Sequence, residues 1–204
     1  QIAWVQFDEP ALVLDMDDSD KALFHQIYDE LLAVETDTKV LLQTYFGDIR
    51  DIYEEVINMP FAGIGLDFIE GKQTCDLVSK YGFPKDKVLF AGVVNGKNIW
   101  KNHYGDSLAT ITWLKNSEIS TVINTSCSLL HVPYTLKNET KLDADYTKHF
   151  AFAEEKLEEL NELKILSDLD SYETHPAFIK NLELFSSKRK NSYCLLYTSP
   201  SPRD

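Results

Sequence analysis

Five short runs of almost continuous apolar residues are the feature that most constrains how this chain folds. Strands buried on both faces read as continuous apolar runs, whereas strands with one wet face alternate. A stretch with helical spacing of apolar residues follows each run, and this alternation is typical of βα units built around a parallel sheet. The predicted strands are AWVQF (3–7), KVLLQTYF (39–46), FAGIGLDFI (61–69), KVLFAGVV (87–94) and TVINTS (121–126).

Helical patterns fill the segments between these runs. Residues 19–35 follow a Ser19 cap, residues 48–58 begin at Asp48, and two shorter helices are predicted at 74–81 and 106–116. The first of these helices is expected to bury one apolar face, made of Leu23, Ile27, Leu31 and Val34.

The longest predicted helix spans residues 143–164 and begins at Asp143. Its apolar positions recur on one face, and its acidic positions lie on the opposite face, for which plain solvation is the simplest interpretation. The apolar set is Phe150, Ala153, Leu157, Leu160 and Leu163, and the acidic set is Glu154, Glu155, Glu158 and Glu159.

The fold class predicted from this order is α/β, with about five parallel βα units that form a sheet either open or closed into a barrel. Five units do not close the eight strands of a TIM (β/α)8 barrel. The first strand begins at residue 3, with no helix before it to cover it. We therefore expect a partial barrel that is truncated at its N-terminus.

The net charge and the cysteines limit which classes of binding partner and which cellular compartment are expected. The chain has 33 acidic and 20 basic residues, a formal net charge of -13, which disfavours nucleic acid and anionic membrane surfaces as partners. No apolar run is long enough to span a bilayer. The three cysteines, Cys75, Cys127 and Cys194, form no disulfide pattern, which predicts free thiols in the cytoplasm.

Polar side chains gather where the predicted strands end, which is where barrels place their reactive groups. Asp8 follows the first strand, and Pro10 would fix its turn, so Asp8 can offer a carboxylate to an amine or a proton to a substrate. A loop salt bridge or a helix cap is the alternative. Asp67, with Glu70 beyond it, follows the third strand.

The stretch after the fourth strand, NGKNIWKNHYG, offers a second group of candidates. Asn95, Lys97 and Asn98 can hold a carboxylate, and Trp100 can stack on a flat ring. A tight turn at Gly96 with Trp100 packed beneath it is an equally good interpretation.

Cys127 and His131 lie four residues apart after the fifth strand. A zinc site would need about two further ligands, and a thiolate nucleophile would need the histidine beside its sulfur together with an oxyanion hole. A buried inert thiol and a hydrogen-bonded structural histidine form the third alternative.

Several multi-residue motifs, in order, make residues 1–165 resemble the amino-terminal half of the cobalamin-independent methionine synthase family. The motifs are WVQFDEPALVLD, GIGLDFIEG, LFAGVVNGKNIW, SCSLLHVPYTLKNETKLD and FAFAEEKLEEL. The resemblance implies a two-barrel cytoplasmic enzyme that transfers a methyl group from 5-methyltetrahydropteroyl-triglutamate to homocysteine and so makes methionine. Zinc would lie in the carboxy-terminal barrel.

The same resemblance implies a domain layout. Residues 1–166 would be the second part of the N-terminal barrel, roughly strands 4 to 8, and residues 167–187 would begin the interdomain connector. Residues 188–204 end in CLLYTSPSPRD, which resembles translated adaptor sequence and predicts a non-native read-through tail. The partners implied are the C-terminal catalytic barrel of the same polypeptide and the folate polyglutamate, in a protein that is a monomer at full length.

This segment is expected to be non-catalytic and to hold no metal. The family's catalytic barrel places a His-x-Cys, a Glu, a proton-donating His and a final Cys after successive strands, and only Cys127 persists here, as a vestigial ligand position. The segment would then supply scaffold and part of the folate groove. The alternatives are a self-sufficient metal-free lyase or decarboxylase that uses Asp8 and Lys97 on an acidic substrate, and an interaction module that uses the acidic helix.

Overall fold

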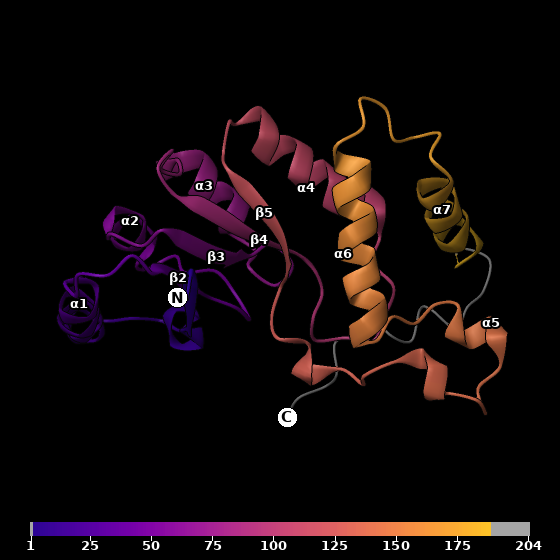
Figure 1. Cartoon of the computed structure of the whole chain (residues 1–204), viewed down its shortest axis with the longest axis horizontal. Helices are drawn as coiled ribbons and strands as arrows, with labels where there is room; N and C mark the ends of the chain where they lie inside the picture. Colours follow the sequence, from indigo (N-terminus) through magenta and orange to yellow (C-terminus); the bar gives the residue numbers. More distant parts are fainter. Residues whose placement is uncertain (1, 189–204) are drawn as a thin grey trace.

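A computed structural model describes residues 2–188 of the 204-residue chain. It contains one sheet of five parallel strands in the order β1-β2-β3-β4-β5, joined by helices (Figure 1). The predicted α/β class and the positions of all five predicted strands are therefore confirmed, although the first and last strands are exposed or half-buried rather than buried on both faces. The strands are β1 (Trp4–Asp8), β2 (Lys39–Gln43), β3 (Gly63–Asp67), β4 (Val88–Val94) and β5 (Thr121–Thr125).

Seven α-helices and three short 3-10 helices accompany the sheet within the described residues. The α-helices are α1 (Asp18–Leu32), α2 (Tyr53–Asn58), α3 (Thr74–Tyr81), α4 (Tyr104–Asn116), α5 (Ala144–Thr147), α6 (Ala153–Ser167) and α7 (Pro176–Lys188). The 3-10 helices are η1 (Pro10–Val13), η2 (Leu129–His131) and η3 (Leu136–Asn138). None of the helices that the structure describes is both long and apolar enough to cross a membrane.

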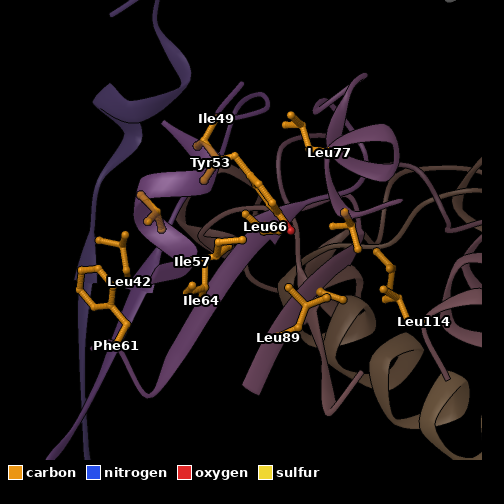
Figure 2. Packing of buried hydrophobic residues seen from close by; sticks show 14 of the residues in the cluster. Leu42, Ile49, Tyr53, Ile57, Phe61, Ile64, Leu66, Leu77, Leu89 and Leu114 are labelled. Atoms are coloured by element: carbon orange, nitrogen blue, oxygen red, sulfur yellow. The ribbon is translucent and has the colours of Figure 1, made fainter. Parts of the chain in front are cut away.

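The core lies between the sheet and its covering helices. Alternate strand residues point toward the helices and are almost fully buried, as Figure 2 shows for Leu42, Ile64, Leu66 and Leu89. The opposite face of the sheet is more open, because Trp4 is 36% and Val122 is 42% exposed. Each strand lies beside its sequence neighbour, so right-handed crossovers would place all connecting helices on the same face.

The prediction for α1 was wrong about which face is buried. The helix begins one residue before Ser19, and Asp17 is its cap, accepting hydrogen bonds from the amides of Ser19 and Asp20. Phe24 and Tyr28 are buried, whereas the predicted core residues Leu23, Ile27 and Val34 are exposed. The face with the aromatic residues is buried because the Tyr28 ring packs on Phe7 and Phe61 and its hydroxyl donates to Glu9 at 2.5 Å.

The helix predicted from residue 48 begins later, at Tyr53. Asp48 does not cap it, because the Asp48 carboxylate accepts from the Gln73 amide at 3.1 Å and from Arg50 at 2.8 Å. The helices predicted at 74–81 and 106–116 are confirmed as α3 and α4.

The single helix predicted over 143–164 was also wrong, since the chain forms α5 and α6 with an extended break between them. In that break Phe150 makes an antiparallel bridge with Trp100, and the Ala151 amide donates to the Ile99 carbonyl at 2.7 Å. Pairing with another segment requires extended backbone, which a helix cannot supply.

The buried stripe of α6 also differs from the predicted one. It consists of Lys156, Glu159, Leu163 and Leu166, whereas Leu157, predicted to lie in the core, is 56% exposed. Glu159, predicted to be solvated, is therefore an interior residue.

The predicted connector, residues 167–187, runs from the end of α6 into α7 (Figure 1). Helix α7 contacts α4. Of the predicted read-through tail, residues 189–204 lie outside the described residues.

Candidate functional site at the carboxyl edge of the sheet

The carboxyl ends of the five strands meet at one edge of the sheet, and this edge is the candidate site. Asp8 ends β1, Asp67 ends β3, and Asn95 directly follows β4. Parallel α/β sheets bind their ligands at this edge, because side chains from several strands converge there.

Asp67 is an architectural residue of the edge. It is 1% exposed, and its Oδ1 accepts hydrogen bonds from the amides of Ile69 (2.8 Å) and Glu70 (2.9 Å). Its Oδ2 accepts from the amide of Phe46 at 3.0 Å. Burial raises the pKa of Asp67, and the three backbone amides oppose this shift. The carboxylate thus joins the loop after β2 to the loop after β3.

Phe46 is the centre of an aromatic and cationic cluster on this edge. Its φ of 75° is uncommon for a residue with a side chain, and the Asp67 hydrogen bond holds its amide in place. The ring of His131 lies 5.4 Å from the Phe46 ring, and the Lys97 Nζ lies 5.1 Å from its centroid. Lys97 also pairs with both oxygens of Glu70, at 3.0 and 3.1 Å.

The predicted residues Asn95 and Asn98 shape the loop that carries Lys97. Asn95 Oδ1 accepts from the amides of Lys97 (2.8 Å) and Asn98 (3.0 Å), and Asn98 Oδ1 accepts from the Trp100 amide at 3.1 Å. Their side-chain oxygens therefore serve the turn itself, as asparagines in turns commonly do.

Gly96 lets this loop approach the end of β5. A Cβ at Gly96 would lie 2.4 Å from the Cys127 carbonyl oxygen, so a larger residue does not fit without a backbone shift. Cys127 is 4% exposed, its Sγ lies 3.8 Å from the Ser128 carbonyl oxygen, and it also interacts with the Ser126 side chain. Burial raises its thiol pKa, which opposes formation of a thiolate.

Asp8 lies at the open end of β1. Its Oδ1 accepts a 2.7 Å hydrogen bond from Gln6, and it also interacts with the hydroxyl of Tyr45. The pKa of Tyr45 is raised, first by burial and then by the Asp8 charge. Asp8 is thus an exposed carboxylate beside an aromatic hydroxyl.

Trp100 is not part of the cluster around Phe46. Its ring packs edge-on against Phe150 at 5.2 Å, and its carbonyl accepts from Lys156 at 3.1 Å. Of the seven predicted site residues, the structure gathers Lys97 and His131 on Phe46 and uses Asp67, Asn95 and Asn98 to build loops. Trp100 lies at the junction with α6, and Asp8 is exposed at the end of β1.

The described residues do not fit a zinc ion. Residues 2–188 contain no group of three or more His, Cys, Asp or Glu side chains arranged to hold a metal. Cys127 lies beneath the Gly96 loop, and the His131 ring contacts Phe46, so the pair that is close in sequence does not converge.

Two groups of functional candidates escaped the sequence interpretation. Tyr45 and Phe46 follow β2, and their rings lie 4.8 Å apart; an aromatic pair at a polar strand end is a signal that could have indicated them. The buried charges of Lys156 and Glu159 had no such signal: the predicted helical pattern placed Glu159 on the solvated face and gave Lys156 no role.

Five parallel strands in sequential order, with a polar carboxyl edge, define this segment as an α/β protein built of βα units. The family model described as "Cobalamin-independent synthase, N-terminal domain" matches residues 1–119. The match covers more than half of the chain, so the chain belongs to this family.

Curated relatives agree with the family match. The chain is 53% identical over 188 residues to the 5-methyltetrahydropteroyltriglutamate–homocysteine methyltransferase of Lactococcus lactis subsp. lactis, which covers 92% of this chain and 24% of that protein. It is 53% identical over 187 residues to the protein of the same name from Campylobacter jejuni subsp. jejuni, with coverage of 92% and 24%. The chain therefore spans about a quarter of the length of these relatives.

Proposed function

We propose that the polypeptide to which this segment belongs transfers a methyl group from 5-methyltetrahydropteroyl-triglutamate to homocysteine, forming methionine in the cytoplasm. The observation that carries this proposal is 53% identity over 92% of the chain to relatives named for that reaction. Apolar or charge patterns alone are shared by unrelated proteins, whereas this match extends over 188 residues and so spans the segments that form the carboxyl edge.

Within that enzyme the segment serves as scaffold rather than as catalytic centre. Its five strands would be strands 4 to 8 of an eight-stranded barrel, supported by the sequential strand order and the more open second face of the sheet. Zinc would be held in the other barrel, because the donor groups of residues 2–188 do not converge. Residues 1–166 belong to the N-terminal barrel, and residues 167–187 begin the connector to the C-terminal barrel of the same monomer.

The carboxyl edge would form part of the groove between the two barrels. The cluster made of Phe46, Lys97 and His131 presents cationic and aromatic groups, which suit the carboxylates of a polyglutamate tail. Asp8 lies on the same edge, at the end of the open strand β1. In this arrangement Lys97 would exchange Glu70 for a substrate carboxylate.

The alternative, a self-sufficient lyase or decarboxylase, has less support. Asp8 and Lys97 would have to act together on the substrate, yet Lys97 pairs with Glu70 and Asp8 accepts a hydrogen bond from Gln6. A sheet of five parallel strands also leaves backbone groups unpaired at both of its edges.

Elemental analysis and a methyl-transfer assay test the proposal. We expect the 204-residue chain, purified with and without the Cys127→Ser substitution, to retain no stoichiometric zinc and to form no methionine. A polypeptide extended through the flanking reading frame should hold one zinc and form methionine from both substrates. One zinc held per short chain and lost in Cys127→Ser would refute the scaffold role, and an extended, zinc-loaded protein without activity would refute the reaction.

A further inference from the structure

The short segment Trp100–Tyr104, between β4 and α4, is held almost entirely by residues from the C-terminal part of the chain. The Lys156 Nζ donates to the Trp100 carbonyl at 3.1 Å, and Glu159 Oε1 accepts from the Asn102 amide at 2.9 Å. Asn181 of α7 accepts from the Tyr104 amide at 3.0 Å and donates to the Asn102 carbonyl at 2.8 Å. Helices α6 and α7 therefore both hydrogen-bond to the backbone of this segment, which we call the gripped segment.

The two charged residues in this grip are interior residues. Lys156 is 0% and Glu159 is 3% exposed, and they occupy the same stripe of α6 as Leu163 and Leu166. No ion pair within 4.0 Å joins Lys156 to Glu159 among the described residues, and Glu159 Oε2 has no hydrogen-bond partner there. Apolar residues at these two positions would avoid the cost of removing two charged groups from water. A contribution to folding stability therefore does not by itself explain why Lys156 and Glu159 occupy them.

We propose that Lys156 and Glu159 are positioning residues of α6 that fix the loop carrying Lys97 to this helix, in a joint that loosens when Glu159 ionises and its unpaired Oε2 becomes a buried charge. The Asn95–Trp100 loop ends where the gripped segment begins, so a shift of α6 would move the loop directly. This role concerns the coupling of α6 to the loops of the carboxyl edge, and it does not depend on which reaction the intact protein performs.

The protonation of Glu159 follows from its surroundings. Burial raises its pKa to about 7, while the Asn102 amide and the charges of Lys156 and Lys101 lower it and Glu162 raises it. Tyr104, whose hydroxyl donates to Glu162, is a further titratable group close by, and its pKa is raised by burial. A neutral Glu159 still accepts the Asn102 hydrogen bond through Oε1, whereas the ionised form leaves a buried charge with one unpaired oxygen.

The sign of the pH effect follows from proton linkage. In the closed state, in which α6 holds the segment Trp100–Tyr104, Glu159 keeps its proton up to about pH 7. In the open state, in which Glu159 is in water, it releases the proton near its ordinary pKa of 4.5. Opening therefore becomes easier as the pH rises between these two values and levels off above pH 7. From pH 5 to pH 7.5 the opening constant should rise on the order of fiftyfold.

Hydrogen–deuterium exchange of the 204-residue chain tests the proposal, with rates corrected for intrinsic exchange and protection at Lys101–Tyr104 expressed relative to β3. Wild-type protection of the loop should fall by about fiftyfold from pH 5 to pH 7.5. Glu159→Gln, which keeps the Oε1 acceptor and is always neutral, should lose this dependence, and Glu158→Gln, at an exposed neighbour, should behave as wild type. His103 and His149 are present in all three chains, so any pH dependence of the protection that they cause cancels in this comparison.

Lys156→Met provides a second measurement, with an expected loss of relative loop protection at both pH values because the Trp100 carbonyl loses its donor. Equal pH dependence in the wild type and Glu159→Gln would overturn the proposal. Unprotected β3 amides at pH 5 would also overturn it, since the packing of α6 on the sheet would then be absent.

Discussion

Asp67→Asn tests how the carboxyl edge is built, because it changes one buried side chain with little change in shape. The carboxylate of Asp67 accepts three backbone hydrogen bonds, from the amides of Phe46, Ile69 and Glu70. An asparagine has only one acceptor oxygen, so in either orientation its NH2 group faces at least one amide donor. The substitution therefore loses at least one hydrogen bond in a site that water does not reach.

The magnitude follows from two opposing contributions. Loss of a charge-assisted hydrogen bond, with a buried donor left unpaired, costs about 1.5–3 kcal/mol. Removal of a buried charge recovers part of this, because burial raises the pKa of Asp67 and so disfavours its ionised form. We expect a net loss of about 2 kcal/mol in the free energy of unfolding, which corresponds to roughly 4–8 °C in Tm for a chain of this length.

Urea denaturation followed by circular dichroism measures this loss, and Asp86→Asn, at an exposed position near β4, serves as the control with an expected change within about 0.5 kcal/mol. A raised pKa means that the folded state binds more protons than the unfolded state between the two pKa values. Wild-type stability should therefore fall as the pH rises through that range, and Asp67→Asn should lack this contribution. Equal stability of Asp67→Asn and the control would refute the role assigned to Asp67.

Two further predictions concern the glycines and the thiols. Gly82 follows α3 with φ 75° and ψ -175°, a region that is essentially restricted to glycine, so Gly82→Ala should lose about 2 kcal/mol although open space surrounds its Cβ position. Gly105→Ala, in the first turn of α4, should change the stability by less than about 0.5 kcal/mol, because its backbone is helical and its Cβ would lie 3.2 Å from Cε1 of His103. Urea denaturation that gives both variants the same stability would contradict this interpretation of the backbone. With a disulfide reagent at pH 8, exposed Cys75 should react much faster than buried Cys127, as measured in Cys75→Ser and Cys127→Ser chains that both also carry Cys194→Ser; rapid labelling of Cys127 would indicate that the Gly96 loop does not cover it.

The strands were predictable because each one is long enough, and apolar enough, to leave a local signal. GIGLD in β3, for example, is buried at every position, and a strand buried on both faces shows a continuous apolar run in the sequence. The polar edge was predictable for the same reason, because Asp8 and Asp67 stand where such runs stop. The motifs around them also carried the family resemblance that the comparisons bear out.

The roles of the edge residues were not predictable from spacing. Asn95 and Asn98 were candidate ligand groups, yet their side chains bond to their own loop. Cys127 and His131 lie one helical turn apart in sequence, but Cys127 lies beneath Gly96 and the His131 ring packs edge-on against Phe46. A contact between distant segments decides each case, and no local pattern reports it.

The amino-acid sequence by itself determined the α/β class, the strand positions and the family, because these depend on local apolar runs and on identities at many positions. Only the tertiary structure decided which faces of α1 and α6 are buried and where the segment 143–164 breaks. Phe150 leaves the helix because Trp100 offers it an extended partner, and Glu159 is buried because the Asn102 amide needs an acceptor. A backbone group that must be satisfied in the interior can override helical periodicity, and its position is known only once the chain has folded.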